Sequence, residues 1–309
     1  MTRAESPRST PRLGLALIFA LALVLRVTVA LQYDAHHPQA DAPVIDEASY
    51  DEWGARIAGG EWMGAEVFFQ EPLYPYTLGV VYAVFGHDRG AARKVQCVLG
   101  ALTAVLVALL AARMFGRNAG LVAGFAAAVY RPTLLFPSLL LKPTLFLLIL
   151  TALVLVLLST REHDSKRRWI VVGVLAGLGA LLRGNLFVML PWILAWPIAR
   201  ARMRAQPMAP AVRHSLAALA GILLVLLPVA ARNAHVGGVF VLTTSGAGTS
   251  KLAPASPSVQ DDTLHAPTQL RLARPHARHE TKTKTKRSRF PGCGGEGQAV
   301  LAPPNLRTT

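Results

Sequence analysis

The stretch LGLALIFALALVLRVTVAL, residues 13–31, holds one charged residue, Arg26, among 19. As an α-helix it would extend about 28 Å, which matches the roughly 30 Å hydrocarbon core of a bilayer. Three arginines precede it, as in a signal peptide, but the run is long for that role and no small-residue cleavage site stands clear of it. We therefore predict an uncleaved first membrane helix.

Further apolar runs predict six more membrane helices, near residues 92–112, 118–136, 138–158, 169–182, 186–199 and 214–231. The fifth and sixth of the seven helices are short and also fit one re-entrant hairpin. The predicted fold class is all-α, a polytopic transmembrane helical bundle. The chain has 309 residues, is 52% hydrophobic and carries a formal charge of +15. Lys and Arg mark cytoplasmic loops, so this charge does not indicate nucleic-acid binding. The two cysteines, Cys97 and Cys293, form no disulfide framework and no metal-ligand spacing.

The basic residues fix one alternating topology with a cytoplasmic N-terminus, residues 1–12. Its cytoplasmic clusters are Arg3, Arg8 and Arg12; Arg113 and Arg117; Arg161 and Lys166 to Arg168; and Arg200, Arg202 and Arg204. The loop 32–91 is then external, as are the turns at Arg131, Arg183 and Arg232. We expect a bacterial inner (plasma) membrane protein with residues 13–245 as its transmembrane domain. Residues 246–309 are basic and rich in proline, which predicts a disordered tail. A frameshift or a truncation would account for this non-native-looking segment.

The external loop is acidic. Residues 32–73 contain nine of the seventeen acids of the chain and one strong base, Arg56. Within it, Asp46 to Ala58 predicts an amphipathic helix that stops at Gly59-Gly60. Residues 73–85 follow a proline and predict a second helix along the membrane surface, with Tyr74, Tyr76 and Tyr82 at headgroup level. Such a concentration of acids beside the first membrane helix indicates chemistry or cation binding.

Two motifs in this loop resemble a known class. Asp46-Glu47-x-x-Tyr50 and Glu71-Pro72-Leu73-Tyr74-Pro75 are similar to the start of GT-C glycosyltransferases that use polyprenyl-phosphate sugars. The class includes the dolichyl-phosphate-mannose protein mannosyltransferases (glycosyltransferase family 39), the aminoarabinose transferases of lipid A and the Rgt-type galacturonosyltransferases. Later segments resemble downstream helices of the class, namely Leu181-Leu182-Arg183 and Pro228-x-x-x-Arg232-Asn233. The resemblance covers about residues 13–245.

The resemblance implies a reaction and a set of roles. A sugar would pass from a polyprenyl-phosphate donor to an external acceptor, a lipid, glycan or protein, with inversion and with Asp46 as general base. Glu47 and Glu71 are candidates for orienting acceptor hydroxyls or holding a divalent metal, although no cofactor is required. Tyr50 and Tyr74 would line the substrate groove. Four basic residues near the outer face are candidates for binding the donor phosphate: Arg26, Arg131, Lys142 and Arg183, with Arg232 as a weaker fifth.

Structural alternatives exist for each of these residues. Asp46 is also a good helix N-cap, with Ile45 and Tyr50 at the spacing of a hydrophobic staple. Glu47 fits a favourable first-turn charge, and Glu71 fits a solvated loop. The basic side chains fit snorkelling toward lipid headgroups. For the whole chain, the alternatives are a transporter or lipid flippase and a non-catalytic truncated remnant.

Overall fold

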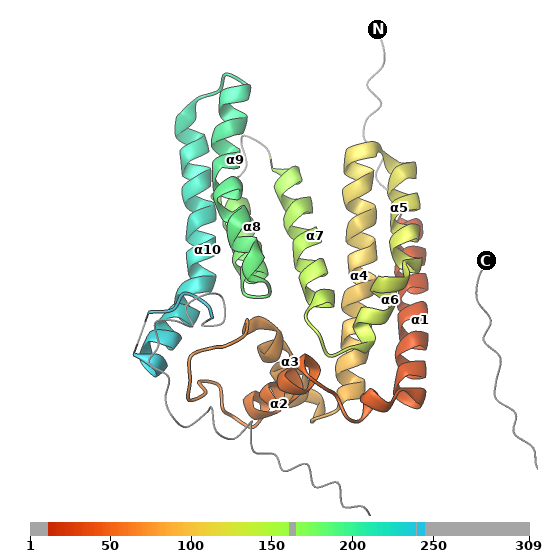
Figure 1. The fold of residues 1–309 in the computed structure, drawn as a ribbon. Coiled ribbons are helices and arrows are strands. Elements are labelled where there is room, and N and C mark those ends of the chain that lie inside the picture. Colours follow the sequence, from red (N-terminus) through yellow and green to blue (C-terminus); the bar gives the residue numbers. More distant parts are fainter. Residues whose placement is uncertain (1–11, 161–164, 239, 245–309) are drawn as a thin grey trace, which may run out of the picture. The chain divides into compact units, whose positions relative to one another are not determined.

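The computed structural model describes residues 12–160, 165–238 and 240–244, all within one compact unit. The predicted tail and most of the predicted N-terminal segment lie outside the described residues. Every regular element in the described part is helical, which confirms the all-α fold class (Figure 1). The α-helices are α1 (Arg12–His36), α2 (Asp46–Ala58), α3 (Leu73–Phe85), α4 (Arg89–Phe115), α5 (Arg117–Val129), α6 (Arg131–Leu135), α7 (Pro143–Ser159), α8 (Lys166–Ala180), α9 (Leu190–Met203) and α10 (Met208–Gly237). The 3-10 helices are η1 (Pro38–Ala40), η2 (Phe136–Ser138) and η3 (Gly184–Met189).

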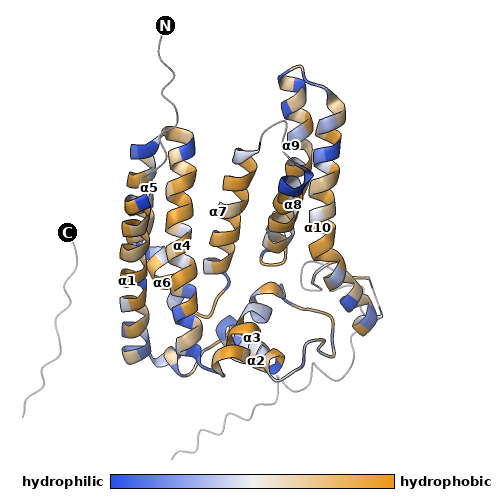
Figure 2. Ribbon diagram, turned by 180° about the vertical axis from the view of Figure 1, so that it is seen from behind, coloured by the Kyte–Doolittle hydropathy of each residue, from blue (hydrophilic) through white to orange (hydrophobic). Residues whose placement is uncertain are grey.

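The long helices run back and forth between two ends of the bundle (Figure 1). Helices α1, α4 and α5 pack together, α8, α9 and α10 form a second group, and α7 contacts α4 on one side and α8 on the other. Hydrophobic residues dominate the middle of these helices, and hydrophilic residues gather toward their ends (Figure 2). In the described residues four helices are long and apolar enough to cross a membrane: α1, α4, Gly184–Met203 and α10.

Prolines explain where the observed helices depart from the predicted ones. The predicted helix 118–136 is broken after Val129, and α5 meets the following segment, Arg131–Ser138, at 57°. Pro132 lacks an N–H and would clash with the preceding turn of a continuous helix. The pair counts as a fifth span if it crosses as one unit. The predicted helix 138–158 begins instead at Pro143, and α7 and α8, with 17 and 15 residues, are short for a membrane span.

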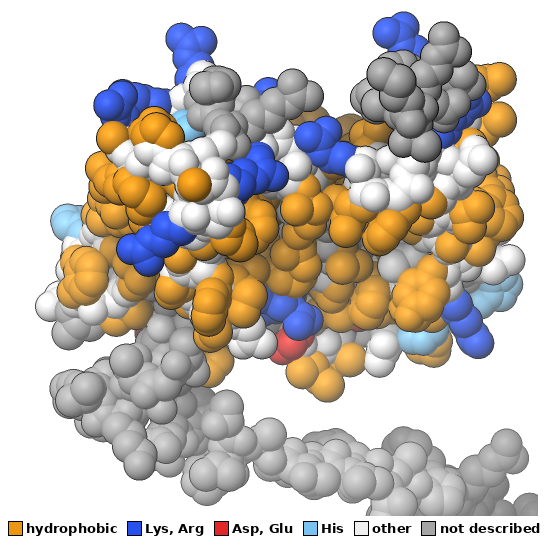
Figure 3. Space-filling model, turned by 90° about the horizontal axis from the view of Figure 1, so that it is seen from above, with side chains coloured by type: hydrophobic (Ala, Val, Ile, Leu, Met, Phe, Trp, Pro, Cys, Tyr) orange, Lys and Arg blue, Asp and Glu red, His pale blue; other side chains and the backbone are white. Residues whose placement is uncertain are grey.

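The two ends of the bundle differ in charge. One end carries the residues that follow α4, those that begin α8 and those that end α9, where the basic clusters lie; we call it the basic end. Figure 3 looks onto this end, where Lys and Arg side chains are spread over the surface and acidic ones are scarce. The opposite end, the loop end, carries α2, α3 and the turns at Arg183 and Arg232, whereas the turn at Arg131, between α5 and α6, lies about halfway along α1 and α4 (Figure 1). Apart from the turn at Arg131, the residues that the topology predicts on one side lie at one end of the bundle.

Helices α8 and α10 approach each other through glycine. A Cβ on Gly221 would lie 3.0 Å from the Cα of Gly173, and one on Gly173 would lie 2.8 Å from the carbonyl carbon of Ala218. Small residues let membrane helices pack closely. We expect Gly173→Ala to lower the free energy of unfolding by about 1–3 kcal/mol, because the backbones must separate to admit a methyl group. Thermal unfolding in detergent measures the change. Val171→Ile adds a methyl to an exposed position of the same helix and should leave the melting temperature unchanged.

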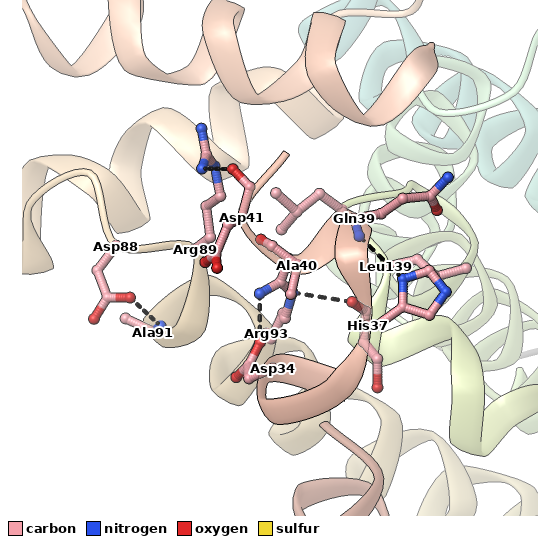
Figure 4. Close-up of polar contacts among 12 residues, drawn as sticks. Asp34, His37, Gln39, Ala40, Asp41, Asp88, Arg89, Ala91, Arg93 and Leu139 are labelled. Carbon is pink, nitrogen blue, oxygen red and sulfur yellow. Dashed lines mark hydrogen bonds and ion pairs between the residues drawn. The ribbon is translucent and has the colours of Figure 1, made fainter. Parts of the chain in front are cut away.

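Buried polar contacts fix the first loop to the bundle (Figure 4). Arg93 of α4 is ion-paired with Asp34 at the end of α1, and its guanidinium also donates to the carbonyls of Ser138, at 3.0 Å, and Ala40, at 2.8 Å. Arg89 donates to the carbonyl of Asp41 at 2.7 Å. One helix, α4, therefore orients the chain on both sides of η1 before α2 begins.

Helices α2 and α3 form a hairpin across the loop end, with the predicted boundaries. Its core contains Tyr50, Tyr74, Leu78 and Tyr82. The depth of these tyrosines at lipid headgroup level stays a prediction, but Tyr74 and Tyr82 are buried in the protein and are not exposed to lipid. The reason is packing between elements, because both rings are covered by α2 and α4, which a periodicity within α3 does not reveal.

Candidate active site at the loop end

Asp46 is the first residue of α2 and its carboxylate is exposed. The N-cap residue is Ile45, at φ 54°, and no side-chain cap hydrogen bond is formed. Ile45 is 86% exposed, so it does not form the hydrophobic staple. The alternative in which Asp46 caps the helix is therefore wrong. The nearest side-chain donor is the amide of Gln70, whose Nε2 lies 3.5 Å from Asp46 Oδ1.

Glu71 is joined to two segments that are distant in sequence. Its Oε2 lies 2.5 Å from the ammonium nitrogen of Lys142, and its Oε1 accepts the N–H of Gly184 at 3.2 Å. Burial alone would raise the pKa of Glu71, but the hydrogen bonds from Lys142 and from main-chain N–H groups outweigh it and lower the pKa. Glu71 is therefore ionised near neutral pH and occupied by its partners, which suits positioning better than proton abstraction. The solvated-loop alternative for Glu71 does not fit these contacts.

Lys142 and Arg183 bring positive charge to this end of the bundle. Burial alone would lower the pKa of Lys142, but Glu71 and Tyr50 more than compensate and raise it. The Lys142 ammonium also lies 5.8 Å from the centroid of the Tyr50 ring. Arg183 is exposed beside Gly184, with its guanidinium carbon 5.5 Å from the ring centroid of Phe146. Among the residues described, no acidic side chain pairs with Arg183.

Arg26 and Arg131 belong to a different part of the bundle. Arg26 is 1% exposed, and its guanidinium donates to the carbonyls of Ala127 and Ala128 at the end of α5, both at 3.2 Å. Positive charge is favoured at the C-terminal end of a helix, so these contacts stabilise the break between α5 and α6. Arg131 is exposed at the start of α6. The four basic residues predicted to bind the donor phosphate therefore do not lie together: Lys142 and Arg183 lie beside Glu71, whereas Arg26 and Arg131 lie at the end of α5.

The remaining predicted site residues, Glu47, Tyr50 and Tyr74, are buried. Glu47 accepts the N–H of Leu140 at 3.1 Å and so ties α2 to the segment before α7. Tyr50 and Tyr74, each 1% exposed, pack edge to face with their ring centroids 5.2 Å apart. Both rings belong to the buried core of the α2–α3 hairpin and do not line an open groove in this structure.

Two cavities lie beside the loop between α2 and α3. Asp46 lines neither of them, but Gln70, which contacts Asp46, lines the polar one. A polar cavity of about 440 Å³ is lined by α2 and by the loop between α2 and α3: Ser49, Trp53, Arg56, Glu61, Gly64, Ala65, Glu66, Val67, Phe68, Phe69 and Gln70, with Arg232 from α10. An apolar cavity of about 300 Å³ is lined by Phe68, Pro72, Leu73, Tyr76, Leu181, Pro228, Val229 and Arg232. Gln70, which contacts Asp46, was not predicted, although it directly precedes Glu71-Pro72.

Arg232 and Asn233 anchor the loop that forms both cavities. The Arg232 guanidinium donates to the carbonyls of Met63 and Glu66, the latter at 2.6 Å, and lies 3.8 Å from the centroid of the Phe68 ring. Asn233 Oδ1 accepts the N–H of Phe68 at 3.5 Å. The guanidinium of Arg232 is thus hydrogen-bonded to the loop carbonyls, which makes it a poor candidate for binding a phosphate.

Metal binding has little support in the ligand arrangement. In the described part of the chain, no three His, Cys, Asp or Glu side chains gather as a metal site would need. Asp46 contacts the Gln70 amide and Glu71 is paired with Lys142, so neither carboxylate is arranged with the other as a metal ligand.

Asp51 is a structural acid that the sequence did not single out. It is 2% exposed and accepts hydrogen bonds from Tyr82 at 2.6 Å, His87 at 2.9 Å and Arg89 at 2.9 Å. Burial alone would raise its pKa, but these donors outweigh burial and lower it. The network joins α2, α3 and the start of α4.

We expect Asp51→Asn to lower the free energy of unfolding by about 2–3 kcal/mol at neutral pH, because partly buried donors lose their charged acceptor. Since the folded-state pKa is depressed, this stabilisation is present above the unfolded value of about 4 and is lost as the pH falls through the folded one. Unfolding measured at pH 7 and at pH 3 should therefore show a difference that shrinks in acid. Glu52→Gln, at the exposed neighbouring position, is the control, and an equal effect there would contradict the role of Asp51.

Comparison with known proteins places this arrangement in context. Residues 70–231 match the family model described as dolichyl-phosphate-mannose-protein mannosyltransferase. The chain is also 28% identical, over 166 residues, to undecaprenyl phosphate-alpha-4-amino-4-deoxy-L-arabinose arabinosyl transferase 2 of Proteus mirabilis. That alignment covers 50% of this chain and 30% of the relative, so the chain spans less than a third of that protein. No solved structure matches the chain. The family match contains Glu71, Lys142 and Arg183 and begins after Asp46.

Proposed function

Because this chain belongs to the dolichyl-phosphate-mannose-protein mannosyltransferase family, a GT-C family of membrane glycosyltransferases, we propose that it transfers a sugar from a polyprenyl-phosphate donor to an acceptor hydroxyl. The observation that carries the proposal is the grouping at the loop end. The exposed carboxylate of Asp46, which caps no helix, contacts Gln70, the neighbour of Glu71 in the Glu71–Lys142 pair. Arg183 directly precedes Gly184, whose N–H donates to Glu71, and no acidic side chain of the described residues pairs with Arg183.

In the proposed reaction Asp46 takes the proton of the acceptor hydroxyl as its oxygen bonds to the anomeric carbon of the sugar. The bond between that carbon and the phosphate oxygen breaks at the same time, and the phosphate leaves with its lipid. Attack from the face opposite the phosphate inverts the configuration. One carboxylate suffices, because no covalent sugar–protein intermediate is formed.

Lys142 and Arg183 are proposed to stabilise the negative charge that the phosphate gains as it leaves. Glu71 keeps the Lys142 ammonium charged and directed, and the raised pKa of Lys142 supports this assignment. Since Glu71 cancels the charge of Lys142, the net positive charge of this cluster comes from Arg183. Arg26 and Arg131 are left out of the clamp, because they lie at the break between α5 and α6.

The orientation follows from the charges at the two ends. Lys and Arg concentrate on the cytoplasmic side of membrane proteins, so we assign the basic end to the cytoplasm and the loop end to the outside of a bacterial inner membrane. The donor sugar and the acceptor would then both be presented on the outer leaflet.

Purified protein in liposomes tests the proposed function. The donors are undecaprenyl-phosphate-linked sugars, and the acceptors are lipid A, a serine- and threonine-containing peptide and an oligosaccharide. We expect the release of undecaprenyl phosphate to require both a donor and an acceptor. Release at the rate of empty liposomes with every donor would contradict the proposal.

A further inference from the structure

The two cavities at the loop end share a boundary. Phe68 and Arg232 line both the polar cavity of about 440 Å³ and the apolar cavity of about 300 Å³. The guanidinium carbon of Arg232 lies 3.8 Å from the centroid of the Phe68 ring, so the two side chains form one wall. A ligand that crosses this wall must be apolar on one side and polar on the other.

The polar cavity does not suit a phosphate. Its cationic residues are Arg56, which lies 3.9 Å from Glu61, and Arg232, which is bonded to the carbonyls of Met63 and Glu66. With Glu61 and Glu66 also in the lining, the formal charges of these four residues cancel. Hydroxyl groups, which donate to carboxylates and accept from amides, fit this lining better than an anion does.

The apolar cavity does not suit a second polar group. Apart from the wall, its lining is Pro72, Leu73, Tyr76, Leu181, Pro228 and Val229, and the Tyr76 hydroxyl is already bonded to the carbonyl of Trp62. Leu73 and Leu181 are joined by a main-chain hydrogen bond of 3.4 Å, which sets this cavity beside the turn that carries Arg183. Burying a hydrocarbon chain here would be favourable by the ordinary hydrophobic effect.

We propose that these paired cavities bind an amphiphile with an uncharged, hydroxyl-bearing head in the polar cavity and a hydrocarbon segment in the apolar one. Asp46 lines neither cavity but contacts Gln70, which lines the polar one, so the proposal places the head's hydroxyl at the rim of that cavity beside Gln70. The amphiphile is therefore the acceptor, and the acceptor is a glycolipid-like molecule rather than a water-soluble glycan or peptide. The role of this amphiphile as acceptor rests on the proposed sugar transfer. The binding of the amphiphile to the cavities does not.

The test is photolabelling, which needs no turnover. The probe is octyl β-glucoside with a diazirine at the end of the alkyl chain, added to the protein in lipid nanodiscs. We expect the label on peptides that contain Leu73, Leu181 or Val229. Competing alkyl glucosides of four to ten carbons should gain about fourfold in potency per methylene, since each buried CH₂ contributes about 0.8 kcal/mol.

Val229→Phe should reduce labelling at these peptides at least tenfold, and the smaller change Val229→Leu should reduce it by an intermediate factor. Leu227→Phe adds similar bulk two residues away at a half-exposed position outside the cavity and should not change labelling. Equal labelling in all variants, or label spread over other helices, would overturn the proposal. Alkyl phosphates of equal length that compete more strongly than the glucosides would assign the cavities to the donor and would also overturn it.

Failure of this test is distinguishable from failure of the proposed function. Labelling without sugar transfer in liposomes would retain the amphiphile site and remove the reaction. Transfer to the peptide or the oligosaccharide without labelling would retain the reaction and remove the amphiphile as its acceptor.

Discussion

Asp46→Asn is expected to reduce sugar transfer by about 10²- to 10⁴-fold, the usual contribution of a general base. Asparagine has nearly the same shape and cannot take the acceptor's proton at neutral pH. Because Asp46 makes no cap hydrogen bond and is exposed, the substitution should leave the melting temperature unchanged. The measurements are initial rates in liposomes and thermal unfolding of the same preparations.

The matched control for Asp46 is Asp41→Asn, an exposed aspartate five residues earlier in the same loop. The structure uses the main-chain carbonyl of Asp41, which the substitution preserves. We expect Asp41→Asn to transfer sugar at the wild-type rate. Transfer by Asp46→Asn within a factor of three of wild type would remove Asp46 from the mechanism and direct attention to Glu71.

Lys142→Met is the second variant with a large expected effect. Removing one charged donor from a developing anion costs about 10²- to 10³-fold in rate. It also leaves Glu71 without its ammonium partner, and an unpaired, partly buried carboxylate destabilises the fold. We therefore expect a fall in both the transfer rate and the melting temperature.

A double variant separates these two effects. In Lys142→Met with Glu71→Gln the unpaired charge is gone, so the melting temperature should recover while the transfer rate stays low. Lys94→Met, at an exposed position near the loop end of α4, is the control for loss of a lysine. Recovery of transfer in the double variant would show that Lys142 acts on stability alone.

The sequence was most informative where structure depends on neighbours in the chain. Helices α2 and α3 have the boundaries that Gly59-Gly60 and Pro72 predict, because glycine and proline act on the local backbone. The prediction of one continuous helix over 118–136 was wrong, because the apolar run continues past Pro132 although the helix breaks before it. The resemblance to GT-C glycosyltransferases was confirmed by the family match, although that match begins at Gln70.

The site contacts were beyond reach from the sequence because they join distant segments. Glu71 and Lys142 are 71 positions apart, and Arg232 reaches Met63 across 169. The sequence placed four basic residues at a similar depth and so predicted one phosphate site. In the structure Arg26 contacts the end of α5 and Lys142 contacts Glu71, so the two lie in different places. Burial of Tyr50 and Tyr74 likewise depends on α4 and the segment before α7, which no periodicity within α2 or α3 encodes.

The contact between Arg26 and the end of α5 makes the first apolar helix specific to its own protein. Where α5 stops, the carbonyl of Ala128 accepts from Arg26, more than 100 positions earlier, and the carbonyl of Ala127 accepts from both Arg26 and Thr133. A generic signal anchor of equal length and hydropathy would insert into a bilayer equally well but would take the Arg26 donor away from the carbonyl of Ala128. For this protein, α1 is not interchangeable with any other anchor.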